Sequence, residues 1–464
     1  MTTIARLTAG ELVRLYQRRA LSPFEVAQDT LARIAAHSAI NAFLPVDPQP
    51  VLAQARASEQ RWARGAPLGR IDGVPATIKD NIWAKGLPTR RGSRTTGSEP
   101  APADAPATAR LREQGAVILG KTTMPEHGWI GVCHSPLTGI TRNPWNLERT
   151  PGGSTGGGAA AALLGLGRLH VGTDGAGSLR IPAAFTGVVG FKPSFGRVPV
   201  YPASPLGALS HHGPITATVG EAALMLSIIG APDERDMAAG NGPPIDYAVG
   251  LEDGVRGLRV AYSPRFGGNG YLDPEIEVLA RRAAQSLAEQ GAVVEEADPP
   301  VEQAAAIIRP LWFAAAAGIV KSVAEPDRDL IDPGFLAIAE AGKRASAAAY
   351  IAANLARSEL YQAMLGFHRR YDLVVSPAMP IAAFEAGRET PPGGKFGDDW
   401  MNWSPYTFPL NLTGQPAVSV PCGLTREGLP AGVQMFMSCG NDALVLRAAR
   451  AVERAVPMPK LGGR

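Results

Sequence analysis

The chain has 464 residues, of which 45% are hydrophobic and 19% charged, and its formal net charge is only +3. This length allows one large α/β domain or two or three smaller ones, and the composition is ordinary for a globular enzyme. The basic residues are scattered, without a long Lys/Arg run or an aromatic–basic alternation, so nucleic acid is not an implied partner.

The cysteines and the distribution of apolar residues exclude several other classes of protein. The three cysteines, Cys133, Cys422 and Cys439, are far apart and odd in number, which excludes a disulfide framework and gives no zinc spacing. The N-terminus lacks a signal-peptide pattern, and no apolar run approaches the roughly 20 residues of a membrane span. We therefore expect a cytoplasmic protein, a monomer or homodimer, without membrane contact and without a metal or other cofactor.

The first 65 residues or so are expected to be helical. Thr8 and Glu11 have the spacing of a capping box, in which each side chain bonds the other residue's backbone amide. Ser22-Pro23-Phe24-Glu25 is a stronger start signal, since proline is also favoured in the first turn. An apolar stripe then follows at helical spacing.

Strands and helices alternate through the middle of the chain. Residues 71–82 indicate a buried strand that ends in Lys79-Asp80-Asn81. A helix over 106–114 is expected to end at Gly115 before a strand at 116–119, and the same arrangement recurs around Gly291. Residues 156–166 are glycine, alanine and leucine only, which predicts a helix buried on all sides.

The second half continues this alternation. Helices dominate 300–370, strands are expected at 372–375, 416–421 and 432–436, and a last helix runs from Asn441 to about Val456. The Pro/Gly-rich segment 388–400 could be a mobile flap, and we place the substrate pocket within 300–403. Because the composition does not change along the chain, we expect one α/β domain over 1–464, with a mostly parallel or mixed central sheet.

Ser178 lies in a glycine-rich run at a predicted strand-to-helix turn. A serine after glycine is usually only a turn residue. Here, however, Gly175, Ala176 and Gly177 have little or no side chain to shield their amides. Successive exposed amides at a helix start bind anions, and in an acyl-transfer enzyme they would form the oxyanion hole.

Ser154 and Lys79 complete the set of candidate catalytic residues. Ser154 lies in a second glycine-rich run that leads into a helix, so a phosphate-binding loop is an alternative; that motif, however, needs a lysine that does not follow here. Lys79 ends an apolar strand beside Asp80, where a lysine is most often an ion-pair partner. If it is buried, desolvation would lower its pKa and give a neutral amine that can act as a base.

The chain resembles members of the amidase signature family in these runs and in several others. The matching segments span roughly residues 70–440 in the family's order: Gly73-Val74-Pro75, Lys79-Asp80-Asn81, Gly152-Gly153-Ser154-Thr155-Gly156-Gly157, Gly172-Thr173-Asp174, Gly177-Ser178-Leu179-Arg180-Ile181-Pro182 and Gly187-Val188-Val189-Gly190-Phe191-Lys192-Pro193, followed by weaker matches at Gly213-Pro214-Ile215, Tyr371-Asp372, Ser376-Pro377, Gly414-Gln415-Pro416-Ala417 and Gly432-Val433-Gln434. The resemblance implies a mixed, twisted central sheet covered by helices on both faces.

The resemblance also implies a Ser-cisSer-Lys triad. Ser178 matches the nucleophile, Ser154 the bridging serine after a cis peptide bond, and Lys79 the general base. The oxyanion would be held by the amides of Gly175, Ala176, Gly177 and Ser178, while Asp174 and Arg180 would support this loop.

Two positions depart from the family's usual pattern. Thr155 stands where many members have a second serine, but it keeps a hydroxyl. Ala176 stands where many members have glycine, and a positive φ there would cost about 1 kcal/mol or more.

The substrate pocket is less sharply indicated. Met124, His127 and Cys133 are candidate lining residues, although packing is the plainer interpretation of each. Aromatic surface could come from Trp83, Trp129, Trp145, Trp312, Trp400 and Trp403, of which Trp400 and Trp403 are the leading candidates. A catalytic histidine is disfavoured, since His211 and His212 are adjacent and their side chains would point oppositely in a strand.

The function expected from these residues is hydrolysis of a carboxylic amide through an acyl-enzyme on Ser178, with possible esterase or carbamate hydrolase activity on small molecules. One alternative is the glutaminase-like A subunit of an aminoacyl-tRNA amidotransferase, against which the Ala176 loop and the Ser204–His212 segment argue. Another is a non-catalytic ligand-binding protein, against which intact Lys79, Ser154 and Ser178 argue. An apolar or aromatic substrate group is the preferred expectation.

Overall fold

One mixed sheet runs through the centre of the molecule. The computed structural model describes residues 4–240, 242–267, 270–459 and 461. Ten strands form the sheet in the order β2-β1-β5-β7-β6-β11-β12-β10-β8-β9. Their bounds are β1 (Pro75–Lys79), β2 (Val117–Thr122), β5 (Leu169–Asp174), β6 (Val189–Lys192), β7 (His211–Thr216), β8 (Arg259–Tyr262), β9 (Val293–Glu296), β10 (Leu373–Pro377), β11 (Ala417–Leu424) and β12 (Pro430–Phe436). A separate pair is β3 (His134–Ser135) and β4 (Gly139–Ile140).

The pairing is parallel at both ends of this sheet and antiparallel in the middle. β1 pairs in parallel with β2 and β5, and β8 pairs in parallel with β10 and β9. From β5 to β10, neighbouring strands are antiparallel. The expected mixed α/β fold is therefore confirmed, whereas the single-domain organisation stays a prediction.

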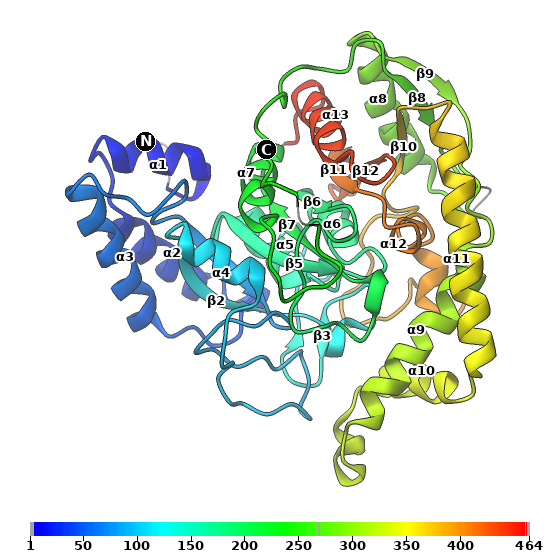
Figure 1. The fold of residues 1–464 in the computed structure, drawn as a ribbon, viewed down its shortest axis with the longest axis horizontal. Helices are drawn as coiled ribbons and strands as arrows, with labels where there is room; N and C mark the ends of the chain where they lie inside the picture. The colour runs from blue at the N-terminus through cyan, green and yellow to red at the C-terminus, as the bar shows by residue number, and fades with distance from the viewer. Residues whose placement is uncertain (1–3, 241, 268–269, 460, 462–464) are drawn as a thin grey trace.

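Helices cover both faces of the sheet. They are α1 (Ala9–Gln17), α2 (Pro23–Ala36), α3 (Pro48–Ala63), α4 (Pro106–Glu113), α5 (Gly156–Leu164), α6 (Arg180–Thr186), α7 (Val219–Ile229), α8 (Pro274–Glu289), α9 (Ala304–Lys321), α10 (Pro333–Lys343), α11 (Ala347–His368), α12 (Pro409–Leu412) and α13 (Asp442–Ala455). Figure 1 shows α1–α3 on one side of the sheet region and α9–α11 on the opposite side.

Alternate residues of β10 separate the two main parts of the core. Leu373 and Val375 belong to the cluster that includes α7, α8 and α13, whereas Val374 belongs to the cluster that includes α6, α9 and α10. Because successive strand side chains point to opposite faces, these two groups of helices cover opposite faces of the sheet.

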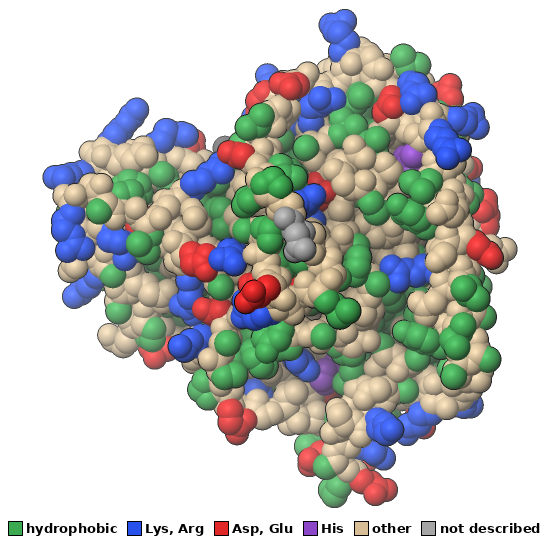
Figure 2. All heavy atoms as spheres, viewed as in Figure 1, with side chains coloured by type: hydrophobic (Ala, Val, Ile, Leu, Met, Phe, Trp, Pro, Cys, Tyr) green, Lys and Arg blue, Asp and Glu red, His purple; other side chains and the backbone are tan. Residues whose placement is uncertain are grey.

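Local signals explain several helix starts and one close contact. Both predicted capping boxes are present, at Thr8 and at Ser22. The apolar helix α5 is buried as expected, and its glycines allow close approach: a Cβ on Gly157 would lie 2.4 Å from Thr123 Oγ1. On the surface, Figure 2 shows acidic and basic side chains interspersed, in keeping with the small net charge.

Among the described helices, α9 is the one that is long and apolar enough to cross a membrane, with a mean hydropathy of 1.4. Its buried residues, including Ile308, Trp312 and Val320, pack in the core cluster shared with α10. This packing accounts for part of the apolar character, since 39% of the helix is buried inside the structure.

Candidate active site

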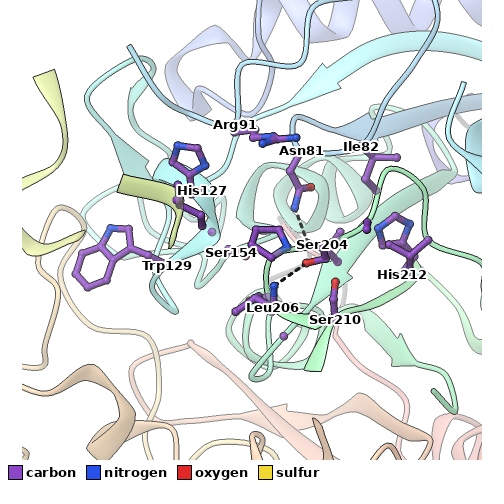
Figure 3. A pocket seen from close by; sticks show the side chains of 18 of the residues that line it. Asn81, Ile82, Arg91, His127, Trp129, Ser154, Ser204, Leu206, Ser210 and His212 are labelled. Atoms are coloured by element: carbon purple, nitrogen blue, oxygen red, sulfur yellow. Dashed lines mark hydrogen bonds between the residues drawn. The ribbon is translucent and has the colours of Figure 1, made fainter. Parts of the chain in front are cut away.

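A cavity lies where β1, β5 and the loops that precede α5 and α6 come together. Ser154, Thr173, Gly175 and Ser178 line one part of its wall, so the two glycine-rich runs of the sequence meet here (Figure 3). The amide of Thr155 donates to the carbonyl of Ser178 at 3.1 Å, which joins the two loops directly.

Lys79, the last residue of β1, is fully buried behind Ser154. Its Nζ lies 2.7 Å from Ser154 Oγ, 2.8 Å from Thr173 Oγ1 and 3.0 Å from Thr155 Oγ1. Burial lowers the pKa of Lys79 to about 7. A neutral amine has only two N–H donors and one lone pair, so one of the three hydroxyls can donate its proton to Nζ.

Asp80 is not the ion-pair partner that a structural role for Lys79 would require. Its two carboxylate oxygens accept the backbone amides of Arg90, at 3.1 Å, and Gly92, at 2.9 Å. Hydroxyl groups, and no carboxylate among the described residues, therefore contact the Lys79 amine. Because no ion pair holds the amine in its protonated form, it can act as a base.

The peptide bond between Gly153 and Ser154 is cis. Glycine is needed at this point because a Cβ on residue 153 would lie 2.1 Å from the carbonyl oxygen of Val132. The backbone here places Ser154 between Lys79 and the cavity.

Ser178 lies in the loop between β5 and α6. Its hydroxyl makes no hydrogen bond to any side chain within the described ranges, and the residue lines the same cavity as Ser154. A serine hydroxyl in this position is free to approach a bound substrate.

Asp174 and Arg180 form the buried support of this loop. Arg180 donates to both oxygens of Asp174 at 3.0 Å, and to the side chains of Asn411 at 2.7 Å and Gln434 at 2.8 Å. Although burial alone would raise the pKa of Asp174, the Arg180 charge and hydrogen bonds hold it well below its usual value. Neither side chain lines the cavity, so their role is to stabilise the loop.

One of the four expected oxyanion amides is already engaged. Gly177 N–H donates to Asp174 Oδ1 at 2.7 Å, so this amide does not face the cavity as expected. The amides of Gly175, Ala176 and Ser178 have no acceptor among the described residues and remain as candidate donors to an oxyanion.

Comparison with known proteins agrees with this geometry. The Amidase family profile matches residues 25–446. An acylamidase of Rhodococcus erythropolis is 35% identical over 97% of this chain and 96% of its own length. The chain belongs to the amidase signature family.

Other members are equally similar in sequence. The A subunit of glutamyl-tRNA(Gln) amidotransferase from Anaeromyxobacter sp. (strain K) is 35% identical over 97% of this chain and 98% of its own length. The solved structure of a bacterial aryl acylamidase of the amidase signature family superposes with a TM-score of 0.90 at 30% identity, covering 97% of this chain and 96% of the other. The protein is thus an amidase signature hydrolase, and its resemblance to acylamidases supports amide hydrolysis.

The two departures from the family's pattern are both accommodated. Thr155 Oγ1 contacts Lys79 and donates to the carbonyl of Thr173 at 3.1 Å. Ala176 is not among the described residues with positive φ; Gly177 has that conformation instead, with φ 125°. A Cβ on Gly177 would also lie 2.3 Å from Thr407 Oγ1, so glycine is required there and not at Ala176.

Only one of the five expected pocket residues lines the cavity of this amidase. His127 does, stacked on Phe335 with 5.4 Å between ring centroids. Met124, Cys133, Trp400 and Trp403 do not, and the expectation is corrected for these four buried residues. They lie behind the wall because other side chains cover them: Trp400 packs on Trp312, and Trp403 stacks on Phe185.

The rest of the cavity wall comes from segments that the sequence indicated only in part. Residues 200–206 contribute a continuous stretch, and Trp129, Trp312 and Phe335 supply aromatic surface. Trp129 and Trp312 were among the six candidate tryptophans, but nothing in the sequence singled them out. Within the described residues, the expected flap 388–400 contributes nothing to the wall, so the cover comes from 200–206, α9 and α10 instead.

Two histidines of the wall are uncharged at neutral pH. Burial lowers the pKa of His127 to about 4 and that of His212 to about 4. His212 belongs to β7 and projects toward the cavity (Figure 3). His211 is not part of the wall; its Nδ1 bonds the carbonyl of Leu209 at 2.9 Å.

Proposed function

We propose that this protein hydrolyses small-molecule carboxylic amides through an acyl-enzyme on Ser178, with esters and carbamates as possible further substrates. The observation that carries the proposal is the buried Lys79, whose Nζ lies 2.7 Å from Ser154 Oγ on the wall that Ser178 shares. A base without a carboxylate partner, next to two serines in one cavity, suits nucleophilic catalysis.

The acylation step follows from this arrangement. Ser178 Oγ attacks the substrate carbonyl carbon and passes its proton to Ser154 Oγ, while Ser154 passes its own proton to neutral Lys79. The negative charge that forms on the carbonyl oxygen is stabilised by the amides of Gly175, Ala176 and Ser178.

The same relay then runs in reverse. Lys79 returns a proton through Ser154 to the leaving nitrogen as the C–N bond breaks, and the amine departs. Water gives a proton to the relay as it attacks the acyl carbon. The relay then returns this proton to Ser178 Oγ as the ester C–O bond breaks, which releases the carboxylic acid and restores Ser178.

The wall of the cavity favours an aromatic or apolar substrate group. Trp129, Trp312 and Phe335 offer flat surface near the serines, and Leu206 and Ile319 add aliphatic surface. The similarity to an acylamidase of Rhodococcus and to a bacterial aryl acylamidase supports linear aryl amides as the first substrates to test.

A second candidate is the glutaminase reaction of a tRNA amidotransferase A subunit, because such a subunit is equally similar in sequence. The aromatic wall favours the first candidate, since glutamine offers no ring or large apolar group to such a surface. A non-catalytic ligand-binding role would require an unreactive Ser178.

The test is labelling by a fluorophosphonate, combined with turnover of p-nitroacetanilide, phenyl carbamates, simple carboxamides and glutamine. We expect labelling at Ser178 and anilide hydrolysis that Ser178→Ala abolishes and Lys79→Ala strongly lowers. Ser210→Ala is the matched control, because Ser210 lines the same cavity outside the triad. No labelling of Ser178, or unchanged hydrolysis in Lys79→Ala, would contradict the acyl-enzyme mechanism. Hydrolysis of glutamine without hydrolysis of any anilide or carbamate would favour the second candidate.

A further inference from the structure

Arg91 places a positive charge on the wall of the catalytic cavity. It is the one Asp, Glu, Lys or Arg among the described residues of that wall. In the view of Figure 3, its side chain lies between those of His127 and Asn81. Its backbone has the left-handed φ of 54°, and its carbonyl accepts the amide of His127 at 2.8 Å, which fixes the residue at this point of the wall.

The guanidinium has no partner of its own. Across the described part of the chain, no acidic side chain lies within 4.0 Å of it, and it donates no hydrogen bond. Several other half-buried arginines have a carboxylate partner, as Arg61 with Asp72 and Arg112 with Asp104 illustrate. The N–H groups of a half-buried, unpaired arginine in a cavity have no protein acceptor, so they can donate hydrogen bonds to a bound anion.

Arg91 and a second cation interact with one and the same nearby carboxylate. Asp80 is the carboxylate that interacts with Arg91, but it also interacts with Lys121, and its oxygens accept two backbone amides. The positive charges of Lys121 and Arg91 repel each other, and both interact with this single carboxylate. The neighbouring His127 is uncharged at neutral pH, because burial lowers its pKa to about 4.

We propose that Arg91 binds a carboxylate on the substrate, so that the enzyme prefers amides that carry an acidic group away from the scissile bond. This inference rests on the proposed function. A guanidinium presents two parallel N–H groups that match a carboxylate, and such a pair is stronger in a partly dry cavity than in water. The bound anion would supply the counter-charge that the protein leaves out.

The experiment uses two matched pairs of amides. N-phenylsuccinamate and N-phenylbutyramide differ by a carboxylate on the acyl side, and 4-acetamidobenzoate and acetanilide differ by one on the amine side. We expect wild-type enzyme to have the higher kcat/KM for the acid in one of the pairs. In Arg91→Gln the acid-to-neutral ratio should fall about 10- to 100-fold, as expected for loss of a charge-assisted bond, with the neutral amide changed less than about threefold.

Two further variants separate charge recognition from folding. Arg91→Lys keeps the charge and should retain part of the preference. Arg90→Gln removes the same charge from the adjacent residue, which does not line the cavity, and should leave the ratio unchanged. Melting temperatures of all three variants show whether any loss comes from misfolding, which would lower the rates for the acid and the neutral amide together.

The outcomes distinguish this inference from the proposed function. Hydrolysis of the neutral amides without a preference for either acid, or a preference that survives in Arg91→Gln, would overturn the role of Arg91 and leave the amidase proposal standing. If neither pair is hydrolysed, the substrate class is contradicted. Calorimetry then tests the anion site by comparing the affinities for N-phenylsuccinamate and N-phenylbutyramide. Tighter binding of the acid by the wild type, with no such difference in Arg91→Gln, would support the site. Equal affinities in the wild type would overturn it.

Discussion

The two walls of the catalytic cavity are built by different kinds of interaction. On the serine side, Lys79, Thr155 and Thr173 are joined by hydrogen bonds, and the Ser178 loop is held by Asp174 and Arg180. In the rest of the wall, residues 200–206, α9 and α10 present mainly apolar and aromatic side chains held by packing. Hydrogen bonds fix atoms to within tenths of an ångström, as proton transfer requires, whereas packing can vary in shape and so sets which substrate fits.

The largest effect should come from removing the base on the serine side. Lys79→Ala should lower kcat/KM for an anilide by about 10²–10⁴-fold, because general base catalysis contributes that much. Lys192→Met is the control: this lysine is equally buried, and its pKa is also lowered to about 7, but its Nζ bonds the carbonyl of Pro193 away from the cavity wall. A comparable loss of kcat/KM in both variants would mean that the activity depends on the presence of a buried lysine in general and not on the position of Lys79 in the relay.

Breaking the support of the Ser178 loop should cost stability as well as activity. Asp174→Asn leaves Arg180 buried without a counter-charge, so the free energy of unfolding should fall by about 3–5 kcal/mol. Denaturant titration measures it. Asp372→Asn removes one partner of the exposed Arg259 pair, and because such pairs are screened by solvent it should lower the free energy of unfolding far less than Asp174→Asn does. Equal effects of the two substitutions would show that the buried network does not support the loop as described.

The pH dependence of catalysis tests the state of Lys79. Since burial lowers the pKa of Lys79 to about 7, the neutral base predominates above that pH and the protonated, inactive form below it. We expect kcat/KM to fall about tenfold per pH unit below the pKa and to level off above it. A profile flat from pH 5 to 9 would be incompatible with Lys79 as the base, provided that the protein remains folded across the range.

The smallest effect is expected on the packed wall. Trp312→Leu should raise KM for an anilide about two- to tenfold, matching an aromatic contact of about 0.5–1.5 kcal/mol, with little change for a small aliphatic amide. Trp62→Leu, on α3 and packed against Tyr16, is the control that loses a tryptophan outside the cavity. If kcat falls for both substrates in Trp312→Leu, the packed wall also positions the catalytic residues.

The sequence by itself singled out the candidate catalytic residues of this protein. Lys79, Ser154 and Ser178 lie in short runs that match the amidase signature pattern, and this resemblance implied the role proposed for each of them. The capping boxes at Thr8 and Ser22 were equally readable, because their hydrogen bonds join residues only three positions apart.

Only the tertiary structure decided what surrounds the reacting atoms. Trp312 lines the cavity, and Trp400 lies behind it. The amide of Gly177 donates its hydrogen bond to Asp174. The side chain of Arg91 lines the cavity without a hydrogen-bond partner among the described residues. The first and the last of these outcomes depend on how segments far apart in the sequence pack together. The Gly177–Asp174 bond joins residues only three positions apart, and it depends on the conformation of one loop. The local sequence around a tryptophan or an arginine does not specify which distant residues will contact its side chain. The residues that line the substrate pocket can therefore be identified only from the folded structure.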